Sequence, residues 1–180
     1  NSINNVVDTA NYIMYDLGQP LHVFDYDKIE GKKIFVRNAK VNEQLETING
    51  NLVKLEVNDV IIADSKKPLA IAGVIGGSNS HVTEGTINIL IESAVFNELN
   101  IRKTSKTHDI STESSKRFER GVDVNSSLLA MEKFVQILQD SNDCNVSEDY
   151  IDIYPEVVKK DSIKFNLDAC NKYLGTDLTI

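Results

Sequence analysis

Two side chains in this sequence, His22 and Glu92, are of types that carry out acid–base or recognition chemistry. His22 lies in the loop 19–22, and Glu92 directly follows the apolar run 87–91. An imidazole can take a proton from an attacking water, whereas a carboxylate beside an apolar strand is costly unless a partner binds it. Taken singly, each residue has a plainer interpretation that is favoured. For His22 it is a hydrogen-bonded structural histidine, and for Glu92 it is a carboxylate on the solvent face of an edge strand.

A glycine pair, Gly76-Gly77, follows an apolar stretch and marks a place where the backbone turns tightly or where another group approaches it closely. A plain turn explains the pair equally well. The segment 73–77 lacks the Lys-Ser/Thr ending of a phosphate-binding loop and the spacing of a dinucleotide fingerprint. The three histidines, at 22, 81 and 108, are too far apart for a recognisable metal-binding pattern. No metal site and no nucleotide cofactor are therefore expected within these residues.

The basic residues of the chain gather in one stretch. The window 101–120 holds six basic residues against three acidic ones, a net charge of +3 in a chain whose net charge is −8. Because nonspecific affinity for nucleic acid comes from many Lys and Arg contacts to phosphate, the chain as a whole is not a generic nucleic-acid binder. Four residues of the window are the candidates for RNA contact: Lys103, Lys106, Lys116 and Arg117. A solvated charged surface is the plainer interpretation of the cluster taken alone.

The composition is that of an ordinary soluble globular protein. With 180 residues, 41% of them hydrophobic and 26% charged, the chain can bury one substantial core. No apolar run approaches the ~20 residues that span a bilayer, and the first residues lack the features of a signal peptide. A cytoplasmic protein with no membrane partner is therefore expected. Cys144 and Cys170 are expected to be unpaired thiols.

Hydrophobic periodicity predicts the elements that position these side chains. Four helices are expected, at residues 6–17, 97–106, about 125–138 and 168–175. Strands are expected at residues 33–37, 45–48, 52–55, 60–63, 69–72, 87–91, 150–154 and 163–167. Gly18 should end the first helix and Asn97 should cap the second. Asn49-Gly50 predicts a tight hairpin between two of the strands.

These elements predict an α+β fold, with mixed β-sheet layers packed against helices. Glu92 should stand at a strand end. The long helix over 125–138 is expected to bury six apolar side chains, those of Leu128, Leu129, Met131, Phe134, Val135 and Leu138. A single domain is expected over residues 1–157, and residues 158–180 are expected to form a linker and the truncated start of a following domain.

Four segments of the chain occur together in a recognisable order. They are Asn4-Asn5-Val6-Val7-Asp8 with Asn11-Tyr12, then 18–25 (GQPLHVFD), 71–77 (IAGVIGG) and 117–123 (RFERGVD). In these motifs and their order the sequence resembles the beta subunit of bacterial phenylalanyl-tRNA synthetase. The resemblance covers residues 2–155 as the editing region of that subunit, and residues 162–180 look like the beginning of its next domain.

The resemblance implies a hydrolytic pocket that removes tyrosine wrongly esterified to tRNA(Phe). It implies that His22 and Asn11 act as catalytic residues around the ester and its water, and that Glu92 binds the tyrosine hydroxyl. Four further residues are implied to bind substrate, Gly76 and Gly77 as close-packed backbone, and Thr112 and Ser114 as a wall of the pocket.

These residue types suit such a task. An apolar site that selects phenylalanine rejects an analogue with one additional hydroxyl only by roughly a hundredfold, so a second, hydrolytic site is warranted. A carboxylate accepts a hydrogen bond from the phenol, whereas phenylalanine leaves it unpaired at a cost of ~1–3 kcal/mol. Ester hydrolysis needs a positioned water and oxyanion stabilisation more than a strong nucleophile, so the absence of a recognisable triad is no objection.

Three positions depart from the pattern of the family. Ala10 stands where threonine is usual, Ser114 where alanine is common, and Val23 where alanine usually follows the histidine. Ala10 lacks a hydroxyl that could hold the substrate or its water. Ser114 makes the wall slightly larger and more polar.

The resemblance also implies partners outside these residues. In the family the beta subunit joins an alpha subunit in an alpha2-beta2 heterotetramer, the alpha subunit carries the aminoacylation site, and the whole enzyme uses ATP and magnesium. A noncatalytic module that binds tRNA or supports the subunit is the alternative to an editing enzyme. A freestanding amino-acid-binding protein of related fold is a third possibility, which the continuation of the chain through 163–180 disfavours.

Overall fold

The first helix begins and ends where the sequence signals stand. A computed structural model describes residues 2–141, 144–147, 150–155, 157–158 and 161–179, and the chain divides into two units, Asn1–Val146 and Ser147–Ile180. In the first unit, α1 (Asn5–Leu17) begins at Asn4, whose side chain accepts a hydrogen bond from the N–H of Val7. It ends at Gly18, which adopts the left-handed conformation with φ of 73°.

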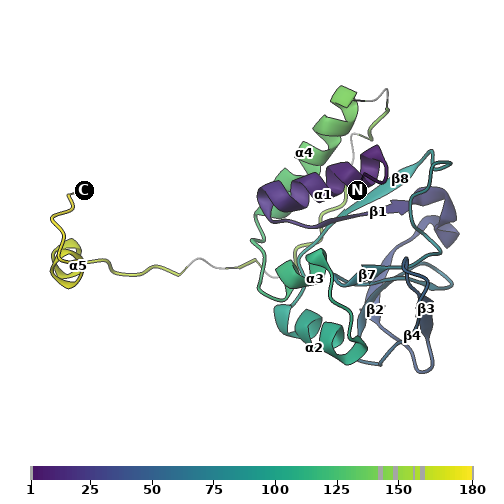
Figure 1. Ribbon diagram of the computed structural model, residues 1–180, viewed down its shortest axis with the longest axis horizontal. Helices are drawn as coiled ribbons and strands as arrows, with labels where there is room; N and C mark the ends of the chain where they lie inside the picture. The colour runs from purple at the N-terminus through teal and green to yellow at the C-terminus, as the bar shows by residue number, and fades with distance from the viewer. Residues whose placement is uncertain (1, 142–143, 148–149, 156, 159–160, 180) are drawn as a thin grey trace. The chain divides into compact units, whose positions relative to one another are not determined.

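A two-stranded antiparallel ribbon lies at the centre of the first unit. It consists of β1 (Leu21–Asp25) and β8 (Ile89–Ser93). Val23 and Ile91 on one face of the ribbon join the apolar cluster of α1 and α4 (Ser126–Ser141), and Phe24 on the other face joins the cluster of the larger sheet. Figure 1 shows α1 and α4 together beside this ribbon. The expected loop at 19–22 is wrong from Leu21 onward, because β1 begins there. This strand forms by pairing with β8, which lies far along the chain, so the residues around β1 do not indicate it.

The larger sheet has four strands in the order β2-β5-β6-β7, and each neighbouring pair is antiparallel. Its members are β2 (Phe35–Asn38), β5 (Val60–Ala63), β6 (Pro68–Ile71) and β7 (Ile75–Gly76). The predicted hairpin is confirmed as β3 (Gln44–Glu46) and β4 (Leu52–Lys54), with Gly50 at φ of 80° in the turn. Two short 3₁₀ helices, η1 (Tyr26–Lys28) and η2 (Glu30–Lys32), connect β1 to the sheet. The α+β class is confirmed, but the expected mixed sheet is wrong, because every strand pair of the described residues is antiparallel.

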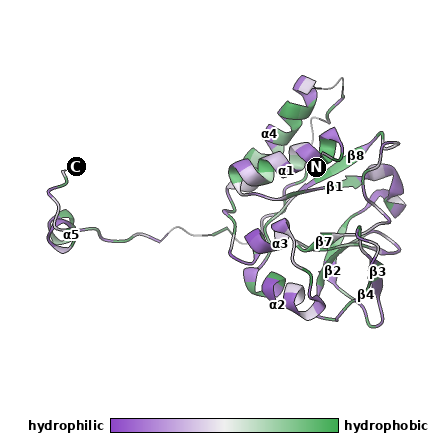
Figure 2. Cartoon of the chain, viewed as in Figure 1, coloured by the Kyte–Doolittle hydropathy of each residue, from purple (hydrophilic) through white to green (hydrophobic). Residues whose placement is uncertain are grey.

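Two helices follow β8 before α4. Asn97 caps α2 (Glu98–His108) as predicted, because its side chain accepts hydrogen bonds from two backbone N–H groups of the first turn. The short helix α3 (Glu113–Phe118) was not predicted, and it begins at Thr112 with a reciprocal capping box to Ser115. Figure 2 shows hydrophobic residues along β8 and mainly hydrophilic ones on α3.

The buried stripe of α4 is narrower than predicted. Ala130, Phe134 and Leu138, each four residues apart, are buried, whereas Leu128 and Leu129 are 39% and 54% exposed. The expectation of burial is wrong for these two leucines, because they lie to the side of the stripe that faces α1. None of the described helices is long and apolar enough to cross a membrane.

The second unit contains one described helix, α5 (Leu167–Leu174). Asn166 caps its first turn, and Gly175, with φ of 67°, follows its last residue. The strands predicted at 150–154 and 163–167 are wrong, because the described residues up to the start of α5 form no strand pairing. Apolar alternation alone does not form a strand, since the backbone also needs a partner edge for its hydrogen bonds. The domain boundary at residue 157 stays a prediction.

Candidate functional site

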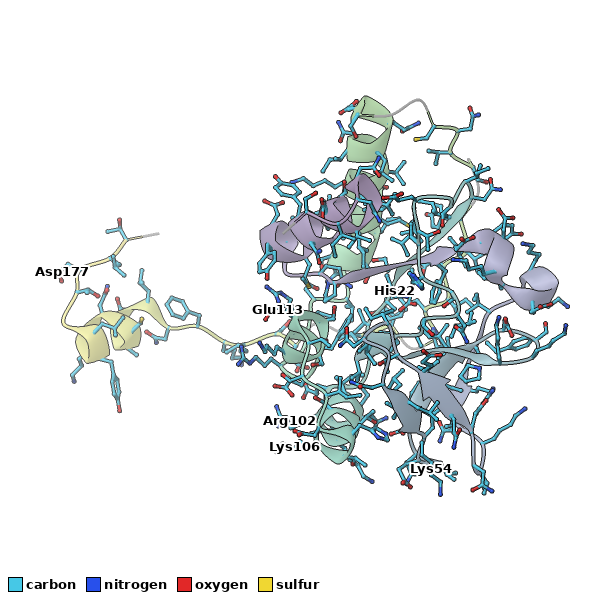
Figure 3. The ribbon with its side chains drawn as sticks, turned by 45° about the vertical axis from the view of Figure 1, so that its right-hand side comes forward. His22, Lys54, Arg102, Lys106, Glu113 and Asp177 are labelled. Carbon is cyan, nitrogen blue, oxygen red and sulfur yellow. The ribbon has the colours of Figure 1, made fainter. Side chains whose placement is uncertain are left out.

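The register of the central ribbon places His22 directly opposite Glu92. Opposed residues of an antiparallel pair share a face, so both side chains leave the ribbon on the side of Phe24 and Leu90, which pack toward the four-stranded sheet. The His22 ring lies edge-to-face with that of Phe24, with 4.4 Å between centroids. Glu92 lies inside β8 and not at its end, so the strand-end expectation is wrong by about one residue. Figure 3 shows His22 between α1 and the sheet.

The backbone of β7 lies against the imidazole. A Cβ atom on Gly76 would lie 2.6 Å from Cε1 of His22, so only glycine leaves room for the ring. Gly77 is equally restricted but by other groups, since its Cβ would lie 2.6 Å from the carbonyl oxygen of Leu69 and 2.8 Å from Cδ1 of Leu45. Close approach by neighbouring groups therefore accounts for the glycine pair, and of the two only Gly76 contacts His22.

The carboxyl group of Glu92 has an unused oxygen. Its Oε2 atom is buried and forms no hydrogen bond with any described residue. Burial raises the pKa of Glu92 from 4.5 to about 8, so the group is mainly a neutral carboxylic acid at pH 7. A buried polar atom without a partner is costly in a folded protein, and a ligand that hydrogen-bonds to it removes that cost.

Burial acts on His22 in the opposite sense. Part of the residue remains accessible to solvent, but the protein surrounds the ring, and burial lowers the pKa of His22 from 6.5 to about 4. The imidazole is therefore neutral at pH 7 and can accept one hydrogen bond and donate another. His22 lies opposite Glu92 and against Gly76, so the site combines an uncharged acid with an uncharged base.

Helix α3 connects the site to its surroundings through the two predicted wall residues. The hydroxyl of Thr112 donates to the carbonyl oxygen of Val74, just before β7, at 2.8 Å, and accepts the N–H of Ser115 at 3.0 Å. The Ser114 hydroxyl lies 3.8 Å from the sulfur of Met14 on α1. Thr112 therefore fixes α3 to the strand that carries Gly76, and Ser114 fixes it to α1. No sequence signal indicates the contact with Met14.

Gln19 lies in the segment 18–25, but no role was predicted for it. Its side chain is fully buried, and its amide nitrogen donates to the carbonyl oxygens of Ala94 at 2.8 Å and Pro20 at 3.2 Å. The Ser126 hydroxyl donates to its amide oxygen at 3.4 Å. Gln19 therefore joins the start of β1, the end of β8 and the start of α4. These three points lie near His22 and Glu92, which we call the facing pair. Nothing in the sequence distinguishes it from an ordinary loop glutamine.

Asn11, the second predicted catalytic residue, is exposed on α1. It lies one helical turn before Met14, and residues three apart are neighbours on a helix. The structure therefore places Asn11 beside the wall formed by Met14 and Ser114, on its solvent side, and not against His22.

The four basic residues predicted to contact RNA fall into two pairs. Lys103 and Lys106 are exposed on α2, and neither side chain forms an ion pair with a described residue. Lys116 and Arg117 on α3 both bind Glu113, at 2.8 and 3.0 Å. Figure 3 shows Lys106 on α2, away from His22, and Glu113 on α3.

A polar depression of about 510 Å³ lies elsewhere, between α2 and the β4–β5 connection. Its lining residues are Asn38, Glu56, Asn58, Asp59, Asn100, Lys103, Thr104 and Thr107. His22 and Glu92 do not line it, so it is separate from the facing pair. Over the described ranges, no group of three or more His, Cys, Asp or Glu residues is arranged to hold a metal ion.

Comparison with known proteins gives a consistent result. The profile of the B3/4 domain matches residues 1–143. The chain is 43% identical over 178 residues to the phenylalanine–tRNA ligase beta subunit of Geobacter metallireducens and 42% identical over 178 residues to that of Protochlamydia amoebophila. It is 38% identical over 177 residues to that of Symbiobacterium thermophilum. Each match covers 98% or 99% of this chain but only 20% or 22% of the relative, so the chain spans about a fifth of their length.

Proposed function

The chain belongs to the B3/4 domain family, in the form found in phenylalanine–tRNA ligase beta subunits, and we propose that its pocket hydrolyses tyrosine esterified to tRNA(Phe). One observation carries the proposal. It is the buried, unpartnered carboxyl oxygen of Glu92, which stands opposite the neutral imidazole of His22. Such an arrangement suits a ligand that brings a hydroxyl group deep into the pocket.

Glu92 is assigned the task of recognising the tyrosine hydroxyl. In its neutral form the carboxyl group can donate its O–H to the phenol oxygen and accept the phenol O–H on its other oxygen. Phenylalanine fills the same space but leaves the buried oxygen without a partner, at a cost of ~1–3 kcal/mol. The pocket therefore favours tyrosine by roughly ten- to a hundredfold, and this preference opposes that of an apolar synthetic site.

His22 is assigned to the attacking water. The neutral imidazole accepts a hydrogen bond from the water as it adds to the ester carbonyl carbon, and the bond from that carbon to the ribose oxygen then breaks. The proton that leaves the water passes through the His22 imidazole to the ribose oxygen, and free tyrosine and deacylated tRNA result. Because Gly76 has no side chain, the imidazole has room to lie at this position. Asn11, on the solvent side of the wall, is assigned to the nucleotide end of the ester.

The remaining proposals concern the whole protein. We propose that the chain is part of a cytoplasmic ligase that binds tRNA(Phe) and contains an alpha subunit in an alpha2-beta2 heterotetramer. ATP and magnesium serve the aminoacylation reaction of that enzyme at a site outside these residues. The names of the relatives and the share of their length that this chain spans support this assignment.

Deacylation of Tyr-tRNA(Phe) by the chain tests the proposal, with Phe-tRNA(Phe) as the competing substrate. Faster loss of the tyrosyl ester is expected. His22→Ala should slow that loss by ~10²-fold, and His81→Ala, the same change at an exposed histidine, should not. An ester that stays intact at every protein concentration would instead indicate a noncatalytic tRNA-binding module, which the exposed Lys103 and Lys106 also suit.

A further inference from the structure

The outward face of α1 carries two large exposed aromatic side chains. Tyr12 is 53% and Tyr15 is 65% exposed, and at a spacing of three residues they lie side by side on the helix. The opposite face of the same helix buries Ala10 and Ile13 in the core. The two tyrosines are therefore not needed for the packing of α1.

Each ring is accompanied by a cation that a neighbouring helix supplies. The guanidinium carbon of Arg117 on α3 lies 4.9 Å from the Tyr15 ring centroid, and the ammonium nitrogen of Lys133 on α4 lies 5.8 Å from that of Tyr12. Both cations are held in place by carboxylates, Arg117 by Glu113 at 3.0 Å and Lys133 by Asp16 at 2.6 Å. Each ring therefore has a cation from a neighbouring helix beside it.

The tyrosines continue the wall of the candidate site toward solvent. Met14 contacts Ser114 in that wall. Asn11 is three positions before Met14 and therefore lies beside it on the helix surface. Tyr15 is four positions after Asn11 and therefore borders it on the outer side. A molecule whose end enters the pocket beside Met14 passes Asn11 and then reaches the tyrosine pair.

We propose that Tyr12 and Tyr15 form a stacking platform for the unpaired nucleotides next to the aminoacyl ester. The inference rests on the proposed function, because an amino acid held at Glu92 is joined through its ester to single-stranded RNA, and that RNA must leave over the rim. Aromatic faces bind the faces of unpaired bases of any identity.

The test uses an RNA hairpin that ends in an unpaired 3′ tail with 2-aminopurine in the tail, and it is not acylated. Binding to the 180-residue chain should quench the fluorescence, because the base stacks on a ring. Tyr12→Leu with Tyr15→Leu should weaken binding roughly tenfold or more and abolish the quench. Tyr12→Phe with Tyr15→Phe should preserve both. Phe35→Leu, at an exposed aromatic residue of β2, is the matched control and should change neither.

Several outcomes overturn the platform. One is a wild-type chain that binds the tail without quenching, and another is a leucine double variant that binds and quenches as the wild type does. The second outcome would instead assign the exposed tyrosine face of α1 to contact with another protein. Because the readout needs no hydrolysis, tail binding with quenching by a chain that leaves Tyr-tRNA(Phe) intact supports the platform while it refutes the proposed function. Circular dichroism verifies that each exposed-site variant is folded.

Discussion

Glu92 and His22 are both uncharged at neutral pH, because burial acts on an acid and on a base in opposite directions. The pKa of Glu92 is raised to about 8 and that of His22 is lowered to about 4. The two side chains face each other without forming an ion pair, and the site avoids the cost of buried charge. A neutral site suits the uncharged side chain of tyrosine.

The neutral state of Glu92 determines how its variants should behave. Glu92→Gln keeps the shape and both hydrogen-bonding roles of a protonated carboxyl group, so the ratio of Tyr-tRNA(Phe) to Phe-tRNA(Phe) deacylation should stay within about tenfold of wild type. Glu92→Ala should reduce the ratio by about 10- to 100-fold, corresponding to ~1–3 kcal/mol, mainly by slowing the tyrosyl substrate. Rate measurements on both substrates decide the matter. Equal slowing of both would show that Glu92 serves the chemistry or the fold and not specificity.

The raised pKa of Glu92 also predicts how stability depends on pH. Because the folded state holds this proton up to about pH 8 and the unfolded state releases it near 4.5, stability should fall as pH rises between these values. The lowered pKa of His22 acts in the other window, where stability falls as pH drops from 6.5 to about 4. Between pH 6.5 and 8 the contribution of Glu92 is the larger of the two, and its loss should be roughly 2 kcal/mol.

Urea denaturation at pH 6.5 and pH 8 measures this loss. Glu92→Gln should remove most of it, because the glutamine amide does not titrate. Glu84→Gln, at an exposed position, should leave the wild-type loss in place. The interpretation is wrong if Glu92→Gln loses as much stability over this range as the wild type.

At the scale of elements, the buried amide of Gln19 joins β1, β8 and α4 beside the facing pair. Gln19→Met has a similar volume but leaves the Ala94 carbonyl without that donor, so unfolding should become easier by ~1–3 kcal/mol. Deacylation should slow as well, since the ends of both strands lose their common anchor. Gln44→Met, at an exposed position of β3, should change stability by less than about 0.5 kcal/mol. A Gln19→Met chain with wild-type stability would show that the amide network contributes little.

The elements that sequence patterns predicted are those with local signals. Gly18 ends α1, Asn97 begins α2 and Asn49-Gly50 joins β3 to β4, and each signal acts within a few residues. Strand β1 and helix α3 are among the elements that were not predicted. Strand β1 depends on pairing with β8, and α3 depends on Thr112, which caps it and binds the Val74 carbonyl. Tertiary partners far along the chain decide elements of this kind.

The candidate residues could be named from the sequence, but their arrangement in space could not. The residue types and sequence positions of His22 and Glu92 mark them as candidates, yet their opposition follows only from the β1–β8 register. Likewise, only the structure explains why residue 76 is glycine, because it shows the imidazole lying against that residue. Gln19 escaped notice because a buried amide and an exposed one have the same sequence signature.

Across the first unit, the positive charge available for RNA is not distributed as the sequence window suggests. Glu113 neutralises part of the charge of Lys116 and Arg117 on α3, whereas the exposed Lys103 and Lys106 on α2 pair with no described carboxylate. In a chain of net charge −8, unpaired cations of this kind determine where phosphate can approach.

The double variant Lys103→Gln with Lys106→Gln should therefore weaken binding of tRNA(Phe) and flatten its dependence on salt. Each phosphate contact contributes about 0.7 to 0.9 to the slope of log affinity against log salt concentration, so the slope should fall by roughly 1.5 if both lysines bind phosphate. Hydrolysis of saturating Tyr-tRNA(Phe) should stay near the wild-type rate, because α2 carries none of the residues assigned to the reaction. Lys33→Gln with Lys40→Gln, at exposed lysines outside the basic window, is the matched control and should leave the slope unchanged. If the control pair flattens the slope as much as the α2 pair does, tRNA binding reflects general charge and not this helix.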